Sequence, residues 1–246
     1  MITHAMIFCA GLGTRFKPWT DKHPKALALV NGKSLLQRNI EYLQSFGIFN
    51  VVINVHHFAD QIEEAVNENH GWGSDILISD ERAELLDTGG GLLKAKPLFE
   101  ENQPFLTCNA DILTNLHIGK LIEFHDQHQP LVSFGITRRE SSRSLLMDPA
   151  HRLCGWRNNK TGEEKIAISP INRTSLQPYA YSCVALFDYS IFNLMQGYGF
   201  GKKFSLIDVY LKLAADYPIL GYEHSKDLVV DVGKPDSIAI AEKLFL

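Results

Sequence analysis

The sequence lacks long apolar runs, blocks of low-complexity composition and internal repeats. A membrane-spanning helix needs about 20 consecutive apolar residues, and no run approaches that length. The first residues contain no basic segment followed by an apolar stretch and small residues, so we expect no secretory signal peptide. No Gly/Ser-rich or Pro-rich linker divides the chain. These absences predict a cytoplasmic protein with a single domain, residues 1–246.

Cysteine is scarce and unpaired. The chain has four cysteines, none of them in a CxxC pair: Cys9, Cys108, Cys154 and Cys183. Isolated cysteines of this kind are typical of buried, reduced thiols in a cytoplasmic protein. A structural zinc site, which is built from clustered cysteine and histidine ligands, is therefore disfavoured.

Positive charge is not in excess either. Lys and Arg number 24 against 28 Asp and Glu, which gives a formal net charge of −4. Proteins that bind nucleic acid or an anionic membrane usually carry a basic surface, so we expect neither partner. Any anion must be held by a local site. The apolar share of 45% and the charged share of 21% are those of an ordinary globular protein.

The first half of the chain alternates strand-like and helical segments. The expected strands cover residues 5–10, 50–55, 75–79 and 104–108. The expected helices begin after the N-cap Ser34, cover residues 59–68, and follow the Gly89–Gly91 triplet as far as Leu98. This alternation predicts parallel βαβ units, and hence a Rossmann-like, doubly wound α/β sheet with helices on both faces. Ligands of such sheets bind beyond the carboxyl ends of the strands.

In the second half of the chain the regular alternation of strand and helix stops, so the sheet is expected to be mixed and mostly parallel. The middle of this half is expected to close over the site. Expected helices cover residues 118–128 and the segment after Pro235. A further helix is expected where apolar residues recur at helical spacing, namely Leu206, Val209, Tyr210 and Leu213. Expected strands cover residues 131–137, 179–187, 218–222 and 228–230, with a hairpin from 153–157 and 165–168.

The segment after the first strand has the composition of a phosphate-binding loop. Gly11 and Gly13 allow backbone N–H groups to approach an anion, and Arg15 and Lys25 supply positive charge. The dinucleotide-binding fingerprint requires a third glycine where Phe16 stands, and no Walker-type Gly-Lys-Ser/Thr follows this glycine pair at the required spacing. The glycines alone are equally typical of a tight turn, whereas the added cations favour a phosphate site.

Two aspartates follow strands at distant points of the chain. Asp111 comes after the strand at 104–108, with Asn109 beside it, and Asp231 follows the strand at 228–230. Carboxylates at strand ends opposite a phosphate loop can hold a Mg²⁺ ion that bridges phosphate oxygens. Each aspartate alone is more typical of a turn or cap. Together with the loop, the pair favours a metal site.

These motifs resemble a known family. The segment Phe8–Pro18, FCAGLGTRFKP, followed by Pro24-Lys25, is similar to the signature of the sugar-1-phosphate nucleotidylyltransferases. The resemblance continues, in the family's order, through Asp87–Gly91, Asn109–Asp111 and Val230–Gly233. It therefore extends over nearly the whole chain.

Within the family, the chain most resembles the short N-acetylmuramate-1-phosphate uridylyltransferases of cell-wall recycling. Cys9 stands where the family usually has alanine, and Ala110 where it usually has glycine. No hexapeptide repeats of a C-terminal β-helix follow, unlike in the bifunctional acetyltransferase members. The resemblance implies a nucleotide-binding half at residues 1–115. It also implies a half at residues 116–246 that binds the sugar and completes the metal site.

The resemblance also implies a reaction and its residues. A sugar-1-phosphate oxygen attacks the α-phosphorus of a nucleoside triphosphate, UTP in the uridylyltransferases, and pyrophosphate leaves. A phosphate monoester has a second pKa of about 6, so positioning and charge neutralisation suffice. Catalytic roles are implied for Arg15, Lys25 and Asp111, and Mg²⁺ binding for Asp111 and Asp231. The implied nucleotide-binding residues are Ala10, Gly11, Gly13, Thr14, Arg15, Asp87, Gly89, Gly90 and Asn109.

Other functions and several side chains stay open. A guanylyltransferase for mannose- or heptose-1-phosphate shares the first motif, and a non-catalytic nucleotide-sugar sensor could use the same fold. A nicotinamide-dependent oxidoreductase is disfavoured by Phe16. The sequence does not identify the sugar or the base, and it is compatible with a monomer or a homodimer. Residues that either touch the ligand or have only a structural role are His56, His57, Arg138, Arg139, Trp156 and Tyr181.

Overall fold

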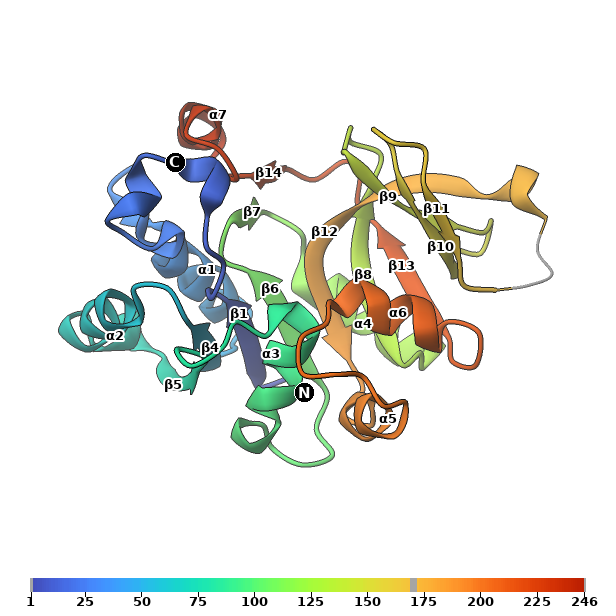
Figure 1. The fold of residues 1–246 in the computed structure, drawn as a ribbon, viewed down its shortest axis with the longest axis horizontal. Coiled ribbons are helices and arrows are strands. Elements are labelled where there is room, and N and C mark those ends of the chain that lie inside the picture. The colour runs from blue at the N-terminus through green and yellow to red at the C-terminus, as the bar shows by residue number, and fades with distance from the viewer. Residues whose placement is uncertain (1, 169–171, 246) are drawn as a thin grey trace.

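The computed structural model describes residues 2–168 and 172–245. Its centre is a mixed sheet with the strand order β11-β10-β9-β12-β6-β1-β4-β5, in which β8 also pairs with β12, and β13 with β8 (Figure 1). The strands are β1 His4–Phe8, β4 Asn50–Val55, β5 Asp75–Asp80, β6 Phe105–Asn109, β8 Val132–Thr137, β9 Arg143–Met147, β10 Leu153–Asn158, β11 Glu164–Ile166, β12 Gln177–Phe187 and β13 Ile219–Glu223.

The strand directions set one functional edge. β1 runs parallel to β4 and to β6, and β4 runs parallel to β5. β12 is antiparallel to both β6 and β8, so β8 runs in the direction of β6. The segments that follow β1, β6 and β8 therefore leave the sheet at the same edge, where ligands of open α/β sheets bind.

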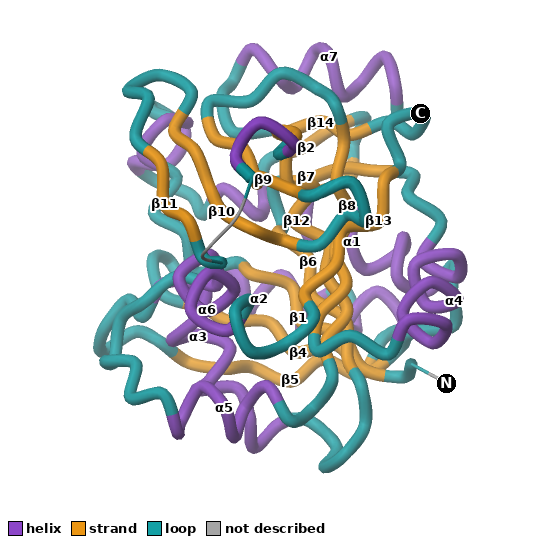
Figure 2. Tube along the Cα trace, turned by 90° about the vertical axis from the view of Figure 1, so that its right-hand side faces the viewer, coloured by secondary structure: helices purple, strands orange, loops and turns teal. Residues whose placement is uncertain are grey.

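Helices cover both faces of the sheet (Figure 2). Side chains of a strand alternate between its faces, and β1 shows the consequence: Ala5 and Ile7 belong to one buried cluster, and Met6 to another. Both clusters are closed by apolar helix faces, which explains why these strands are apolar throughout. The first face is covered by α1 Leu35–Gln44, α2 Ala59–Glu68 and α4 Ile118–His128, and the second by α3 Asp87–Ala95, α5 Ile191–Gly197 and α6 Leu206–Leu213.

A third, smaller core joins the segment after β1 to the last part of the chain. It contains Phe16 from the loop after β1, Leu113 from β7 (Ile112–Thr114), and Val230 from β14 (Val229–Asp231). Ala241 of α7 (Asp236–Leu244) closes it. The short β2 (Leu29–Val30) and β3 (Lys33–Ser34) lie beside it, and Figure 1 shows α7 next to the blue segment that follows β1.

Most expected elements are confirmed, and the differences have physical reasons. The expected helix after the glycine triplet instead begins at Asp87 and includes Gly89–Gly91, all of them buried. It ends at Ala95, and a 3-10 turn follows at Lys96–Leu98, because Pro97 cannot donate a backbone hydrogen bond. The three-residue β7 and the five-residue β9 have no counterpart among the expected strands. Within the described residues, no helix is long and apolar enough to cross a membrane.

Candidate active site

The loop after β1 is held in shape from within. Gly13 has φ 60°, and a Cβ atom on it would lie 2.7 Å from the methyl carbon of Thr20. The Thr20 hydroxyl donates to the Gly13 carbonyl at 2.9 Å, and the Phe16 N–H donates to the same oxygen at 2.7 Å. A side chain at Gly13 is therefore excluded by both backbone conformation and space. Gly11 differs, because no other described atom lies within 4 Å of where its Cβ would be; that open space leaves room for a ligand.

Arg15 is positioned by its neighbour. Phe16 is 2% exposed and packs in the third core with Val230 and Val232, the residues on either side of Asp231. The Arg15 guanidinium lies over Gly233, where a Cβ atom would come 2.8 Å from Arg15 Nη2 and 2.5 Å from Asp231 Oδ1. The loop cation and the second strand-end carboxylate are therefore neighbours. Phe16, the residue that rules out the dinucleotide-binding fingerprint, holds Arg15 beside Asp231 by packing in the third core.

Asp111 lies beside both Lys25 and the Asp231 strand. Lys25 Nζ donates to Asp111 Oδ2, with the two side chains 13% and 24% exposed. β14 pairs with β7 so that Asp231 lies opposite Ile112, and the Val232 N–H donates to the Asp111 carbonyl at 2.8 Å. Two aspartates that are 120 positions apart in the sequence, from 111 to 231, are in this way brought to one place.

A cavity of about 460 Å³ lies at the same edge. It is lined by most of the residues for which the family resemblance implies nucleotide-binding or catalytic roles, namely Ala10, Gly11, Gly13, Thr14, Lys25, Asp87, Asn109 and Asp111. Arg15, Gly89, Gly90 and Asp231 are not among its lining residues. Arg15 and Asp231 instead adjoin it through Gly233, as described above.

The cavity also has polar lining residues that sequence reasoning missed. Asn54 Oδ1 accepts from the Cys9 N–H at 2.8 Å, and its Nδ2 donates to Glu81 Oε1 at 2.7 Å. Glu81, which is fully buried, accepts from the Leu86 N–H at 3.1 Å through Oε2. This chain of hydrogen bonds ties the first loop to the start of α3. Lys203 lines the cavity as a further cation.

The glycines of α3 provide close packing as well as proximity to the cavity. The N–H groups of Gly89 and Gly90 both donate to the Phe204 carbonyl, at 2.9 and 3.1 Å. A Cβ atom on Gly89 would lie 2.5 Å from the Phe204 ring, and one on Gly91 would lie 2.6 Å from Glu81 Oε1. The triplet thus allows the segment before α6 to pack directly on α3. Contact of Gly89 and Gly90 with a nucleotide stays a prediction.

The cysteines are buried or half-buried thiols. All four described cysteines are free. Burial raises the pKa of Cys108 to about 12, and burial, followed by the charges of Cys108 and Asp111, raises the pKa of Cys9. Such thiols are poor nucleophiles at neutral pH. The expectation of unpaired, mostly buried cysteines is confirmed.

A Ser–His–Asp arrangement is present but closed to substrates. Ser182 Oγ lies 2.7 Å from His224 Nε2, and His224 Nδ1 faces Asp227 Oδ2 at 3.4 Å. Ser182 has no exposed surface and His224 is 5% exposed. A nucleophilic serine must reach its substrate, so these residues tie β12 to the segment after β13 and do not form a hydrolase site.

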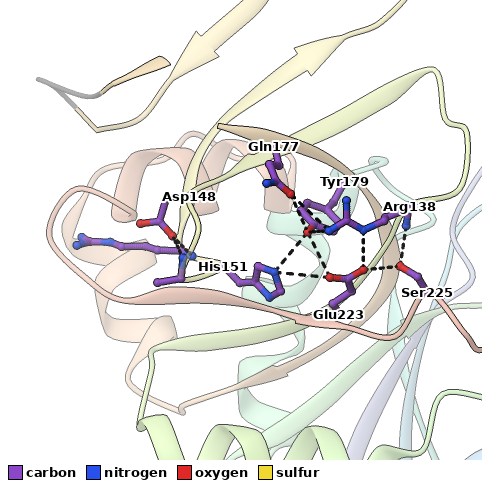
Figure 3. A network of polar contacts seen from close by, with 9 residues as sticks. Arg138, Asp148, His151, Gln177, Tyr179, Glu223 and Ser225 are labelled. Atoms are coloured by element: carbon purple, nitrogen blue, oxygen red, sulfur yellow. Dashed lines mark hydrogen bonds and ion pairs between the residues drawn. The ribbon is translucent and has the colours of Figure 1, made fainter. Parts of the chain in front are cut away.

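Arg138 belongs to a polar network away from the cavity (Figure 3). Its Nε donates to Glu223 Oε1 at 2.9 Å, and its Nη2 donates to the Tyr179 hydroxyl at 2.6 Å. The Tyr179 hydroxyl also donates to Glu223 Oε2 at 3.3 Å, and His151 Nε2 lies 3.7 Å from the same oxygen. The network connects β8, β12 and β13, which favours a structural role for Arg138.

The other undecided side chains also have protein partners. The Trp156 ring lies under Lys165 Nζ at 5.6 Å, and the Tyr181 hydroxyl is 3.3 Å from that of Tyr210 in α6. His56 Nδ1 lies 2.7 Å from the Glu81 carbonyl, and the His57 ring packs on Phe58.

The carboxylates of Asp111 and Asp231 fit a metal ion that binds together with the substrate. No group of three or more His, Cys, Asp or Glu side chains that could hold a metal occurs among residues 2–168 and 172–245. Asp111 and Asp231 supply two carboxylates from adjacent backbone segments. Mg²⁺ is often held by one or two carboxylates, with water and substrate phosphates completing its octahedral shell. The residues present therefore suit Mg²⁺ better than a fully protein-caged ion.

The mixed sheet with helices on both faces defines the chain as an α/β protein, and the glycine loop and the strand-end aspartates lie at the carboxyl edge of this sheet. The chain belongs to the nucleotidyl transferase family, whose model matches residues 4–145. The sequence resemblance and the fold class are thereby confirmed.

Individual relatives resemble parts or all of the chain. The N-acetylmuramate alpha-1-phosphate uridylyltransferase of Caulobacter vibrioides is 40% identical over 121 residues, which are 48% of this chain and 50% of that protein. The mannose-1-phosphate guanyltransferase beta-B of Xenopus laevis is 31% identical over 138 residues, 55% of this chain and 38% of that one. The chain thus matches half the length of these relatives or less. HddC of Yersinia pseudotuberculosis, crystallised with GMP-PN, shares the fold over 100% of both chains, with a TM-score of 0.80 and 21% identity.

Proposed function

We propose that the protein transfers a uridylyl group from UTP to an N-acetylmuramate-type sugar 1-phosphate and releases pyrophosphate. The observation that carries the proposal is the Lys25–Asp111 ion pair beside Asp231, at the edge where the glycine loop ends. An oxygen of the sugar phosphate forms the new bond to the α-phosphorus, and the bond from that phosphorus to the bridging oxygen of pyrophosphate breaks. No proton has to be removed from the nucleophile, because its second pKa is about 6.

Different residues at this edge would neutralise the charges of different phosphate groups. Asp111 and Asp231 would hold Mg²⁺, which neutralises charge on the phosphate oxygens when it is bound. Lys25, whose ammonium group compensates Asp111 in the ligand-free protein, would then face the α-phosphate and the sugar phosphate. Arg15, whose guanidinium forms no ion pair with any described residue and is positioned by Phe16, would hold the triphosphate. The carbonyl and N–H groups of Ala10–Thr14 would border the nucleotide.

The uridylyl assignment is supported by the relative of higher identity, and a guanylyl assignment by the mannose-1-phosphate relative. A nucleotide-sugar sensor needs none of the transfer machinery, so the joint presence of Lys25, Asp111 and Asp231 in one place favours an enzyme. UTP is a cytoplasmic metabolite, and the four free thiols agree with a reducing compartment.

The experiment that tests this function is a matrix of the four nucleoside triphosphates against several sugar 1-phosphates, read as pyrophosphate release with Mg²⁺. We expect UTP with N-acetylmuramate 1-phosphate to be used best. Preference for GTP with a mannose or heptose phosphate would replace the uridylyl proposal by the guanylyl one. Tight binding of UDP-sugars without turnover would support the sensor.

Removal of the metal or of its ligand should stop the reaction. We expect excess EDTA to abolish pyrophosphate release and Asp111→Ala to lower kcat by at least about 100-fold, because the transferring phosphoryl group loses its charge stabilisation. The exposed Asp126 of α4 provides the matched control, since Asp126→Ala removes the same charge far from the loop. Full activity in Asp111→Ala would refute the metal assignment.

A further inference from the structure

Two adjacent arginines follow β8, and their surroundings differ sharply. Arg138 is neutralised by Glu223 in the network of Figure 3. The half-buried Arg139 donates from Nη2 to the Tyr181 carbonyl at 3.0 Å, and its Nε is buried without a hydrogen-bond partner among the described residues. Within residues 2–168 and 172–245, Arg139 forms no ion pair with a distance of 4.0 Å or less.

An uncompensated, partly desolvated guanidinium is costly in a folded protein. Such a group is retained at little cost when a bound anion completes its hydrogen bonds, and a planar carboxylate does so with two parallel N–H···O contacts. The neutral Tyr181 carbonyl satisfies one donor and none of the charge. Arg139 therefore has the properties expected of a residue that binds an anionic ligand.

Arg139 lies at the ligand edge of the sheet. β8 runs in the direction of β6, so the residues after Thr137 leave the sheet where Asp111 does. The pKa of the Cys183 thiol is raised, chiefly by burial and then by the negative charges of Asp111 and Asp231. The positive charge of Arg139 opposes this rise. All three charged groups are therefore near Cys183, which has φ 57° and lies in the irregular part of β12. Arg139 faces the same region as the proposed metal ligands.

The spacing separates Arg139 from the reacting phosphates. β12 lies between β6 and β8, and neighbouring strands are about 4.8 Å apart, so Arg139 is displaced from Asp111 by roughly 10 Å. That displacement is the length of a sugar ring with one substituent. A sugar 1-phosphate with its phosphate at Lys25 and Asp111 would present the far side of its ring to Arg139.

From this placement we infer that Arg139 is a specificity residue that binds a carboxylate carried by the sugar, so that the acceptor is an acidic sugar 1-phosphate. The inference rests on the proposed transferase function and assigns the residue that recognises the acidic group of its sugar. Arg139 binds the carboxylate through the N–H groups that the Tyr181 carbonyl does not occupy, while that carbonyl fixes the orientation of the guanidinium. A neutral sugar leaves the same charge uncompensated and is used less well.

The test compares two acceptors that differ only in charge: N-acetylmuramate 1-phosphate and its lactyl carboxamide. The wild-type protein should prefer the acid by about 10- to 100-fold in kcat/KM, the effect of one charge-assisted bidentate pair. Arg139→Gln should lose this preference through a rise in KM for the acid that exceeds any change for the amide. Arg139→Lys, which keeps the charge but not the bidentate geometry, should lie in between.

Arg138→Gln is the matched control, because it removes the same guanidinium from the adjacent position and should keep the wild-type preference. Calorimetric binding of UTP shows whether each variant is folded. Equal losses on acid and amide in Arg139→Gln would assign Arg139 to the common phosphate and overturn the inference. A wild-type protein without preference for the acid, or an Arg139→Gln variant that keeps it, would also overturn it. Absence of transfer to any sugar 1-phosphate would instead refute the proposed function.

Discussion

Gly233 is the residue at which the two distant parts of the site touch. Its hydrogen occupies the space between Arg15 Nη2 and Asp231 Oδ1, the groups that would bind triphosphate and metal. Neither group is held there by an ion pair among the described residues; both are held by the backbone and by Phe16 in the third core. A single methyl group at Gly233 would therefore displace the side chains without removing either.

Gly233→Ala should lower kcat at least about tenfold, because displacement of a catalytic group by about 1 Å can cost up to 100-fold. The φ of Gly233 is outside the left-handed region, so little loss of stability is expected. Steady-state kinetics and a thermal melt of the variant measure both effects. Gly197→Ala in α5 is the matched control, since no other described atom lies within 4 Å of its Cβ position, and it should leave kcat unchanged. Unchanged kcat in Gly233→Ala would contradict the packing argument.

The residues that sequence reasoning identified are those with a motif around them. Lys25 and Asp111 could be identified because each follows a short signature, and the structure brings them into contact. Asn54 and Glu81 have no such signal, because a buried amide and carboxylate look the same in sequence whether or not they border a cavity. Their hydrogen bonds to Cys9 and Leu86 exist only once β4 and β5 lie beside β1.

Among the elements, α3 is the one whose sequence and packing differ most from those of an ordinary helix. Three consecutive glycines lower helix stability, by roughly 1 kcal/mol each relative to alanine. They are retained because the segment before α6 lies against them: a Cβ atom on Gly90 would collide with the Lys202 carbonyl, and Gly89 and Gly90 both donate to Phe204. The contact keeps Lys203 at the cavity.

Gly90→Ala should destabilise the protein by about 1–3 kcal/mol, the usual cost of overpacking, although alanine is the better helix former. Urea unfolding of the variant measures the difference. Gly197→Ala is the matched control, because no other described atom lies within 4 Å of its Cβ position in α5; it should leave stability unchanged or raise it. A Gly90→Ala protein as stable as the wild type would show that the segment moves aside freely.

For the whole molecule, two buried histidines couple stability to pH. Burial lowers the pKa of His125, which lies 3.0 Å from Ser133 Oγ. Burial also lowers the pKa of His224, and the opposing charge of Asp227 does not reverse this. Below pH about 6.5 the unfolded chain binds protons that the folded protein does not. Both histidines therefore favour the folded state above that pH and favour it less as the pH falls.

The free energy of unfolding should fall on acidification from pH 7 to pH 5.5, with a slope of up to about 1.4 kcal/mol per pH unit for each histidine. Urea midpoints measured across this range provide the slope. His125→Gln and His224→Gln should each flatten it, whereas His128→Gln, at an exposed position on the same helix as His125, should not. A pH-independent stability in the wild type would contradict the expected titration.

The sequence by itself determined the βαβ alternation, the glycine loop and the two strand-end aspartates, because local periodicity and turn chemistry are written in adjacent residues. Only the tertiary structure decided that Asp231 lies beside Asp111, since that meeting depends on the pairing of the short strands β7 and β14. It also separated Arg138, neutralised by Glu223, from Arg139, which has no such partner among the described residues. Two identical neighbouring side chains differ only in what the fold places around them, and no local pattern records that.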